Sequence, residues 1–358
     1  MNGADYLDWP VYGLRQREKE QRLLPELTRL TAHHRERCPE YARVLAALGA
    51  PSIYRTVEEV PFLPVSLFKT HRMASVSSDA VFKTVTSSGT TGQAASQILL
   101  DRDTAQLQTR ALARIMADLL GPERLPMIVV DTNSVIRNRL SFNARAAGVL
   151  GMMTFGRSHL FCLDDHMDLD VAGLRAFLER HAGRRILLFG FTFMVWKHFA
   201  PAVAEAGLCL HDAILVHSGG WKKLAEEAVD ETAFKRRVGE MTGIREIRNF
   251  YGMAEQVGSV YVEGEDGLLY PPAFADVIVR DPVTLAPLPP NEVGVVQVLS
   301  LLPRSYPGHS LLTEDLGVVE HVDRGAPFRC GKGFRIIGRV PRSELRGCSD
   351  VYAAGRGP

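Results

Sequence analysis

Short apolar runs of strand length alternate with longer amphipathic stretches through the middle of the chain. The runs are rich in Val, Ile, Leu and aromatic residues, and polar residues, Gly or Pro bound them, which is typical of β-strands. Strands that alternate with helices predict an α/β layered architecture. The predicted strands are Met127–Asp131, Ile186–Phe189, Ala213–Val216, Ile247–Tyr251, Val257–Val262, Val277–Val279, Val293–Leu299 and Phe334–Ile337.

Amphipathic stretches at helical spacing predict the helices. The first runs from Leu14 to about Arg37, where leucines recur among charged residues, and Pro25 is a candidate breakpoint. A second helix is expected from Asp103 to Leu120, with Asp103 as its N-cap and Gly121 as its stop. The remaining predicted helices are Phe142–Leu150, Val171–His181 and Lys222–Gly239.

The last third of the chain has a different character. From about Gly258 onward, strands follow one another with Gly and Pro turns between them, so a β-rich subdomain is expected to follow an open, mainly parallel sheet. We therefore expect a helical segment over residues 1–80 that packs on a core, the core itself over 81–340, and a tail over 341–358 that carries Cys348.

Composition narrows the class of protein. The 358 residues are 46% hydrophobic and carry a formal net charge of +1, which fits one or two folded cores and gives no electrostatic indication of nucleic acid or an anionic membrane. The apolar stretch Ile186–Trp196 is too short to span a bilayer and is interpreted as a buried strand entering a helix. Five scattered cysteines, no CxxC pair and no secretion signal indicate a reducing, cytoplasmic setting. A small-molecule substrate is the better hypothesis.

A cluster of hydroxyls and glycines between two apolar runs is the most informative segment. It comprises Ser87, Ser88, Gly89, Thr90, Thr91 and Gly92. Backbone N–H and hydroxyl groups in such a loop can converge on phosphate oxygens, and glycine permits close approach. The spacing is not that of the GxxxxGK[ST] loop, so a different nucleotide fold is required. The runs Val81–Val85 and Ile98–Leu100 predict that the loop connects two strands.

The loop and the motifs after it resemble the adenylate-forming superfamily. His217-Ser218-Gly219-Gly220 is similar to the adenine-side loop of that superfamily, and Asn249 to Glu255 resembles its Asn-x-Tyr-Gly-x-Thr-Glu motif. Thr313-Glu314-Asp315 resembles the ribose-binding segment, and Gly338-Arg339 resembles the arginine at the hinge. The motifs occur in the expected order from Thr86 to Arg339.

Longer strings resemble one family in particular, the acyl-protein synthetases of bacterial bioluminescence. They are Lys83 to Gly92, Leu99 to Arg102, Gly219 to Lys223, Ser300 to Gly317 and Leu345 to Asp350. The resemblance implies the large domain of an adenylate-forming enzyme, with its mobile C-terminal domain absent or vestigial. It also implies that a fatty or other acid is activated with ATP, carried on an enzyme cysteine and delivered to a partner reductase.

The same resemblance assigns roles to individual residues. Glu255 would hold Mg²⁺, and the phosphate loop from Ser87 to Gly92 would hold the β- and γ-phosphates of ATP. Tyr251 offers a flat face for adenine and Asn249 a polar edge, with Gly219, Gly220 and Gly252 in the surrounding loops. Asp315 offers acceptors to the ribose diol, and Arg339 supplies a fixed positive charge.

Cys348 is the predicted acyl carrier, because a thiolate attacks an acyl-adenylate readily. The nearby Arg339, Arg342 and Arg346 would favour its thiolate form. His217 and Lys222 are candidates for contact with the substrate, although His217 could equally be a packed, hydrogen-bonded residue and Lys222 a solvated one. Cys330 is expected to be structural.

Three departures from the wider superfamily leave questions open. Gln93 stands where a positive residue often follows the loop, Ala254 replaces a threonine, and the lysine of the C-terminal domain is missing. Lys222, Lys223, Lys332 or Arg342 could replace that lysine. Two alternatives remain at this point: a coenzyme A ligase of the kind that activates phenylacetate, and a non-catalytic nucleotide- or acyl-binding subunit.

Overall fold

The computed structural model describes residues 5–87, 95–137, 144–219, 229–324 and 329–340. The chain divides into two compact units, each described by itself below. The first combines Met1–Leu119 with Tyr251–Glu344, and the second is built around Leu120–Phe250. Both contain a sheet with helices, which confirms the predicted α/β class.

The second unit contains the predicted parallel sheet. Its strands are β4 (Leu125–Thr132), β5 (Gly156–Leu163), β6 (Ile186–Phe191), β7 (Ala213–Ser218) and β8 (Glu246–Tyr251). They lie in the order β8-β7-β6-β4-β5, and every neighbouring pair is parallel. Every residue of β6 is buried, as expected for a parallel strand covered on both faces.

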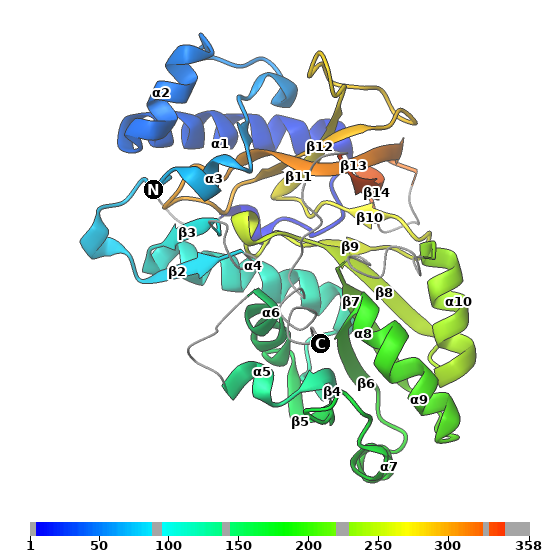
Figure 1. Ribbon diagram of the computed structural model, residues 1–358. Coiled ribbons are helices and arrows are strands. Elements are labelled where there is room, and N and C mark those ends of the chain that lie inside the picture. Colours follow the sequence, from blue (N-terminus) through cyan, green and yellow to red (C-terminus); the bar gives the residue numbers. More distant parts are fainter. Residues whose placement is uncertain (1–4, 88–94, 138–143, 220–228, 325–328, 341–358) are drawn as a thin grey trace, which may run out of the picture. The chain divides into compact units, whose positions relative to one another are not determined.

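Helices cover this sheet on two sides, with α6 on one side of β6 and β7 and the α8–α10 group on the other (Figure 1). Asp230 caps α10 by accepting a hydrogen bond from the Ala233 N–H at 2.7 Å, so this helix begins at Glu231, and it continues past the predicted end at Gly239. The helices are α5 (Ser134–Arg137), α6 (Ala144–Met153), α7 (Val171–Arg180), α8 (Thr192–Met194), the π-helical turn Val195–Phe199, α9 (Ala200–Glu205) and α10 (Glu231–Thr242).

The first unit contains the β-rich part of the chain. Its sheet has the order β11-β12-β13-β14-β10-β9, with antiparallel neighbours, and the short β1 (Leu63–Pro64) pairs with β13 in parallel. A separate hairpin joins β2 (Lys83–Thr86) to β3 (Gln97–Leu100). The other strands are β9 (Tyr261–Glu263), β10 (Leu269–Tyr270), β11 (Ala275–Arg280), β12 (Gly294–Ser300), β13 (Ser310–Val322) and β14 (Lys332–Arg339).

Several local predictions for this unit were wrong. The break at Pro25 does not occur, because α1 runs from Gln16 to Arg37 with the proline inside it. The predicted strand Val257–Val262 begins too early: the strand found there, β9, starts only at Tyr261, because Gly258 adopts φ +86° and interrupts the extended backbone before it. The N-cap of α4 (Arg102–Leu120) is Asp101, which accepts from the Thr104 N–H at 2.8 Å, and not Asp103.

Burial explains why α1 tolerates its proline. An internal proline costs a helix about 3 kcal/mol through a lost hydrogen bond and a steric clash. Leu23, Leu27 and Leu30 lie on one face of the helix and are buried on both sides of Pro25. Each buried leucine contributes roughly 1.5–3 kcal/mol, so the apolar face outweighs the defect. Besides α4 and the 3-10 turn Ala254–Gln256, the helices that accompany α1 in this unit are η1 (Asp5–Asp8), α2 (Pro39–Ala47), η2 (Val57–Glu59), α3 (Leu67–Thr70) and η3 (Ser78–Ala80).

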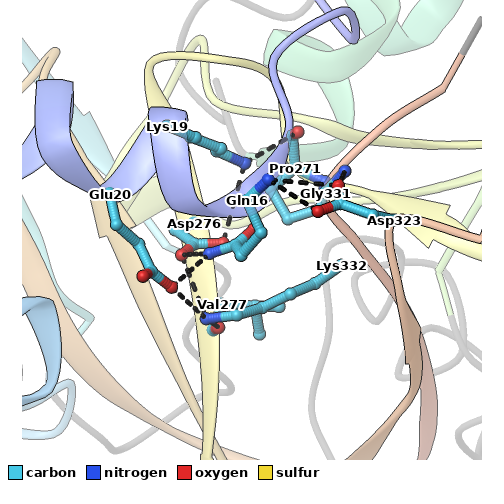
Figure 2. A network of polar contacts seen from close by, with 9 residues as sticks. All are labelled: Gln16, Lys19, Glu20, Pro271, Asp276, Val277, Asp323, Gly331 and Lys332. Atoms are coloured by element: carbon cyan, nitrogen blue, oxygen red, sulfur yellow. Dashed lines mark hydrogen bonds and ion pairs between the residues drawn. The ribbon is translucent and has the colours of Figure 1, made fainter.

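A buried polar network attaches the start of α1 to the sheet (Figure 2). Asp276 of β11 is fully buried and faces two cations. Lys332 of β14 donates to its Oδ2 at 3.1 Å, and the Nζ of Lys19 lies 3.6 Å from its Oδ1. Gln16 adds a hydrogen bond to Oδ2 at 2.8 Å, and Lys19 donates to the Pro271 carbonyl at 3.1 Å. The two lysines together hold the pKa of Asp276 below its ordinary value despite burial, so the carboxylate is ionised.

Two buried histidines also join α1 to the sheet. His34 and His309 stack with ring centroids 5.0 Å apart, and His309 Nε2 lies 2.9 Å from the Thr31 hydroxyl. Burial lowers the pKa of His309 to about 3 and that of His34 well below its ordinary value. Both rings are therefore neutral in the folded protein at pH values where an unfolded chain would protonate them.

Among the described residues, no helix combines the length and the apolar character needed to cross a bilayer.

Asp276→Ala should lower the free energy of unfolding by about 3–5 kcal/mol, because it leaves two lysines buried without their counter-ion. Urea denaturation measures the change. Arg43→Ala is the matched control, since Arg43 is 75% exposed in its ion pair with Glu40 and should cost less than about 1 kcal/mol. Equal, small effects of both substitutions would contradict a stabilising role for the network.

Stability should fall as the pH drops below about 6.5, because the unfolded chain then binds protons that His34 and His309 do not take up when folded. Each histidine contributes a slope of about 1.4 kcal/mol per pH unit until the pH reaches its folded pKa. In His309→Asn the free energy of unfolding should fall less steeply between pH 7 and 5 than in the wild type. The matched control is His211→Asn at an exposed position, which should leave the wild-type pH dependence unchanged. If the free energy of unfolding changes with pH equally in the wild type and in His309→Asn, protonation of the buried histidine on unfolding is not the cause.

Candidate functional site

The structure brings three of the predicted site residues together within the first unit. Asp315 on β13 lies directly opposite Arg339 on β14 in the strand register. The Tyr251 hydroxyl donates to Asp315 Oδ2 at 2.7 Å, and Arg339 Nε lies 3.4 Å from Oδ1. A carboxylate has about four lone-pair positions, so Asp315 retains acceptor capacity for two ribose hydroxyls beside these partners.

The electrostatics of this group follow from partial burial. Burial raises the pKa of Asp315 above its ordinary value, although the Tyr251 hydrogen bond and the Arg339 charge both act to lower it. Burial, together with the Asp315 charge, raises the pKa of Tyr251 well above its ordinary value. Tyr251 is therefore a neutral hydrogen-bond donor at any physiological pH, and its ring packs against Tyr261 at 5.9 Å between centroids.

Glu255 lies on the turn that follows β8 and is buried. The Tyr306 hydroxyl donates to its backbone carbonyl at 2.9 Å and holds the turn. Burial raises the pKa of the Glu255 carboxyl, while the Ser96 hydroxyl and the positive charge of Lys69 act in the opposite direction. A buried carboxylate beside a hydroxyl offers the oxygen ligands that a hard ion such as Mg²⁺ prefers when phosphate oxygens complete its shell. Within the residues that the structure describes, no group of three His, Cys, Asp or Glu could hold a metal by itself.

The phosphate loop has its predicted setting between two strands. β2 and β3 are antiparallel, and Thr86 pairs with Gln97 at their ends. Beyond that pair, the Ser87 N–H donates to the Ser96 carbonyl at 3.2 Å, and the Ser96 N–H donates to Ser87 Oγ at 3.0 Å. The base of the loop is therefore closed by two hydrogen bonds. Ser88, Gly89, Thr90, Thr91 and Gly92 lie outside the described residues.

The second unit holds another group of predicted residues. His217, at the end of β7, is fully buried, with Nδ1 3.0 Å from the Thr192 hydroxyl and Nε2 3.1 Å from Glu231 Oε1. Asn249 donates from Nδ2 to Glu231 Oε2 at 3.2 Å. Both ring nitrogens of His217 thus have protein partners, which supports the packed, hydrogen-bonded interpretation of this residue.

Glu231 organises that group. Burial raises the pKa of its carboxyl, but the His217 hydrogen bond and the Lys235 charge outweigh burial, and the pKa lies below its ordinary value. The glutamate is therefore an ionised acceptor for two predicted site residues. Gly219, directly after β7, has φ +90°, a conformation that favours glycine.

The remaining predicted site residues lie outside these two groups or outside the described part of the chain. Lys332, considered as a replacement for the missing lysine, is buried and pairs with Asp276 in the network of Figure 2, so the structure does not support it in that role. Gly252 follows β8, with Val260 Cγ1 3.2 Å from where a Cβ would stand. Gly220, Lys222, Lys223, Arg342, Arg346 and Cys348 lie outside the described residues.

Sequence reasoning missed Glu231, Glu314 and Lys69. Glu314 lies inside a recognised motif but was given no role, although its carboxylate accepts from Arg339 Nη2 at 2.9 Å. Its place beside Asp315 is the only local signal. Nothing in the sequence links Glu231 to His217 and Asn249, because the contacts depend on where β7, β8 and α10 meet.

Comparison with known proteins gives a consistent result. A family model described as acyl-protein synthetase, LuxE, matches residues 11–355. Two relatives are named long-chain-fatty-acid–luciferin-component ligase. The one from Vibrio harveyi is 22% identical, covering 88% of this chain and 83% of the relative, and the one from Aliivibrio fischeri is 22% identical, covering 93% and 88%.

A solved structure shares the fold. It is a 2-hydroxyisobutyryl-CoA ligase in complex with its acyl-AMP, 18% identical in sequence, with a TM-score of 0.72 over 95% of this chain and 72% of the ligase. At this identity the likeness concerns the fold alone.

Glu231→Ala should destabilise the protein by about 1–3 kcal/mol, because it leaves the His217 and Asn249 groups without their acceptor. Glu231→Gln, which keeps a carbonyl acceptor, should cost less. Thermal or urea unfolding measures both. Glu240→Ala on the exposed side of the same helix is the control and should change stability by less than about 0.5 kcal/mol. If the two alanine variants unfold alike, Glu231 does not organise this group.

Proposed function

The chain belongs to the acyl-protein synthetase family LuxE and is an AMP-forming ligase, and we propose that it activates a long-chain fatty acid and carries the acyl group on Cys348. The final acceptor would be a partner reductase. The observation that carries the proposal is the family match across residues 11–355, which includes the segment around Cys348. The names of the two relatives support a long-chain fatty acid as the substrate class.

The first step joins two anions. A carboxylate oxygen of the acid attacks the α-phosphorus of ATP, the bond between that phosphorus and the bridging oxygen breaks, and pyrophosphate leaves with the electron pair. Catalysis then depends on orientation and on offsetting negative charge. The phosphate loop around Gly89 would hold the β- and γ-phosphates, and Asp315 the ribose diol.

Glu255 would hold Mg²⁺, which when bound neutralises charge on the phosphate oxygens. Arg339 would add a positive charge, and its position beside Asp315 supports that assignment. Asn249 and Tyr251 would face the adenine, and Gly219, Gly220 and Gly252 would leave room for the nucleotide.

The second step moves the acyl group to sulfur. The Cys348 thiolate attacks the carbonyl carbon of the acyl-adenylate, a carbon–sulfur bond forms, the bond from carbon to the AMP oxygen breaks, and AMP leaves. Two other thiols are poor competitors, since burial raises the pKa of Cys38 and of Cys162. Cys209 is exposed and provides a control.

Two assays test the two steps. Acid-dependent exchange of labelled pyrophosphate into ATP should be observed with long-chain fatty acids and Mg²⁺. Radiolabelled acid with ATP should then label the protein through a thioester that hydroxylamine cleaves. Cys348→Ser should abolish labelling and retain exchange, whereas Cys209→Ser should retain both.

The possible failures are distinct. If no acid supports exchange, the adenylation step is refuted and a non-catalytic binding subunit becomes the better description. If exchange occurs but the label appears on added coenzyme A and never on protein, the chain is a coenzyme A ligase. Mass spectrometry of the peptide that contains Cys348 decides the site of the thioester.

A further inference from the structure

A lysine that the sequence did not single out lies beside Glu314, the residue before Asp315 on β13. It is Lys69, on the one-turn helix α3 (Leu67–Thr70). Just before it, β1 runs parallel to β13, with Leu63 opposite Leu311 and Pro64 opposite Leu312. The Val65 N–H donates to the Leu312 carbonyl at 2.9 Å. This pairing carries α3 to the part of β13 where Glu314 and Asp315 lie.

The backbone around Lys69 is anchored by its neighbour. Phe68 is 1% exposed and packs edge-on against Tyr306, with ring centroids 6.1 Å apart. The hydroxyl of the same Tyr306 holds the backbone of Glu255. A single aromatic residue therefore supports both the segment of Lys69 and the turn of the predicted magnesium ligand.

Glu314 joins the two cations of this region. Its Oε2 accepts from Arg339 Nη2 at 2.9 Å, and its Oε1 lies 3.6 Å from Lys69 Nζ. A separation of 3.6 Å is longer than a hydrogen bond, so the pair attracts without fixing the ammonium hydrogens. The Lys69 side chain is 32% exposed, and a solvated ammonium on a flexible stem can turn toward an incoming anion.

The charge of Lys69 also reaches the candidate metal ligand. It acts to lower the pKa of Glu255, against the larger effect of burial, while Glu314 acts to raise it. The charge of Lys69 therefore acts on the carboxyl that would hold Mg²⁺.

We propose that Lys69 is a further catalytic residue of the adenylation step, with Glu314 as the residue that positions it. The ammonium leaves Glu314 and contacts an oxygen of the α-phosphate as the carboxylate of the acid attacks. Lys69 contributes positive charge and transfers no proton, so the bonds formed and broken are those given above for the first step. The inference rests on the proposed function and adds to it the cation that offsets the meeting of two anions.

The other cations described near this group have other partners. Arg339 is engaged by Glu314 and Asp315, and Lys332 is buried against Asp276. Arg72, three residues after Lys69, is exposed and donates to the Ser78 hydroxyl at 2.9 Å. Lys69 combines a partly exposed side chain with a counter-ion, Glu314, that lies beyond hydrogen-bond distance.

The test measures pyrophosphate–ATP exchange at saturating ATP and fatty acid. Lys69→Met should lower kcat by about 10²–10³-fold, the usual effect of removing one group that stabilises transition-state charge, with little change in KM for the acid. Lys69→Arg should recover part of the rate because it restores the charge. Arg72→Met removes a neighbouring surface cation and should leave the rate within about twofold, in line with its lack of a role.

A second measurement separates catalysis from folding. Preformed tetradecanoyl-AMP bypasses adenylation, so Lys69→Met should label Cys348 from it at the wild-type rate. Glu314→Gln should lower the exchange kcat by up to about 10²-fold through misplacement of Lys69 and should also transfer normally from the preformed adenylate.

Each remaining outcome counts against the proposal. If the wild type catalyses pyrophosphate–ATP exchange and the kcat of Lys69→Met is within about threefold of the wild-type value, Lys69 is not catalytic. If Lys69→Met also fails with preformed tetradecanoyl-AMP, its role is structural. If wild type itself shows no exchange with any acid, the proposed function fails first and this inference fails with it.

Discussion

A carboxylate taken out of water must have a cation or a donor beside it, and this constraint governs the first unit of the protein. Asp276 lies between Lys19 and Lys332, and Asp315 lies between Tyr251 and Arg339. The first group ties the opening helix to the sheet. The second arranges polar groups in the way that nucleotide binding would require.

Strand β14 supplies a cation to each of these two groups. β14 begins at Lys332, which pairs with Asp276, and ends at Arg339, which faces Asp315. Its register with β13 places Val322 opposite Lys332 and Asp315 opposite Arg339, so a shift in pairing would separate both sets of charges at once. Stability of the sheet and geometry of the candidate site therefore depend on the same strand pairing. The α3 segment, through β1, joins this arrangement at β13.

Sequence patterns predicted those helices and strands that are determined by the residues within them. The parallel strands β4, β6 and β7 are short runs of Val, Ile and Leu, and burial on both faces makes them recognisable. The hairpin around the phosphate loop was predicted from the apolar runs on either side of the loop, although β2 itself is not buried. The helix break predicted at Pro25 is absent because buried leucines on both sides of the proline stabilise α1. The helix propensity of a single residue does not include this tertiary packing. β13 was missed because polar residues at its centre hide its extended pattern.

The sequence by itself determined the fold class, the family and the positions of the motifs, since these depend on residue type and order along the chain. It also predicted Tyr251, Asp315 and Arg339 for one site, and the structure brings these three side chains together. Only the tertiary structure assigned partners: Lys332 to a buried network, His217 to Glu231, and Lys69 to Glu314. Each of these pairs joins residues whose separation in the chain carries no periodic signal, and the contact exists only because strands and helices bring them together.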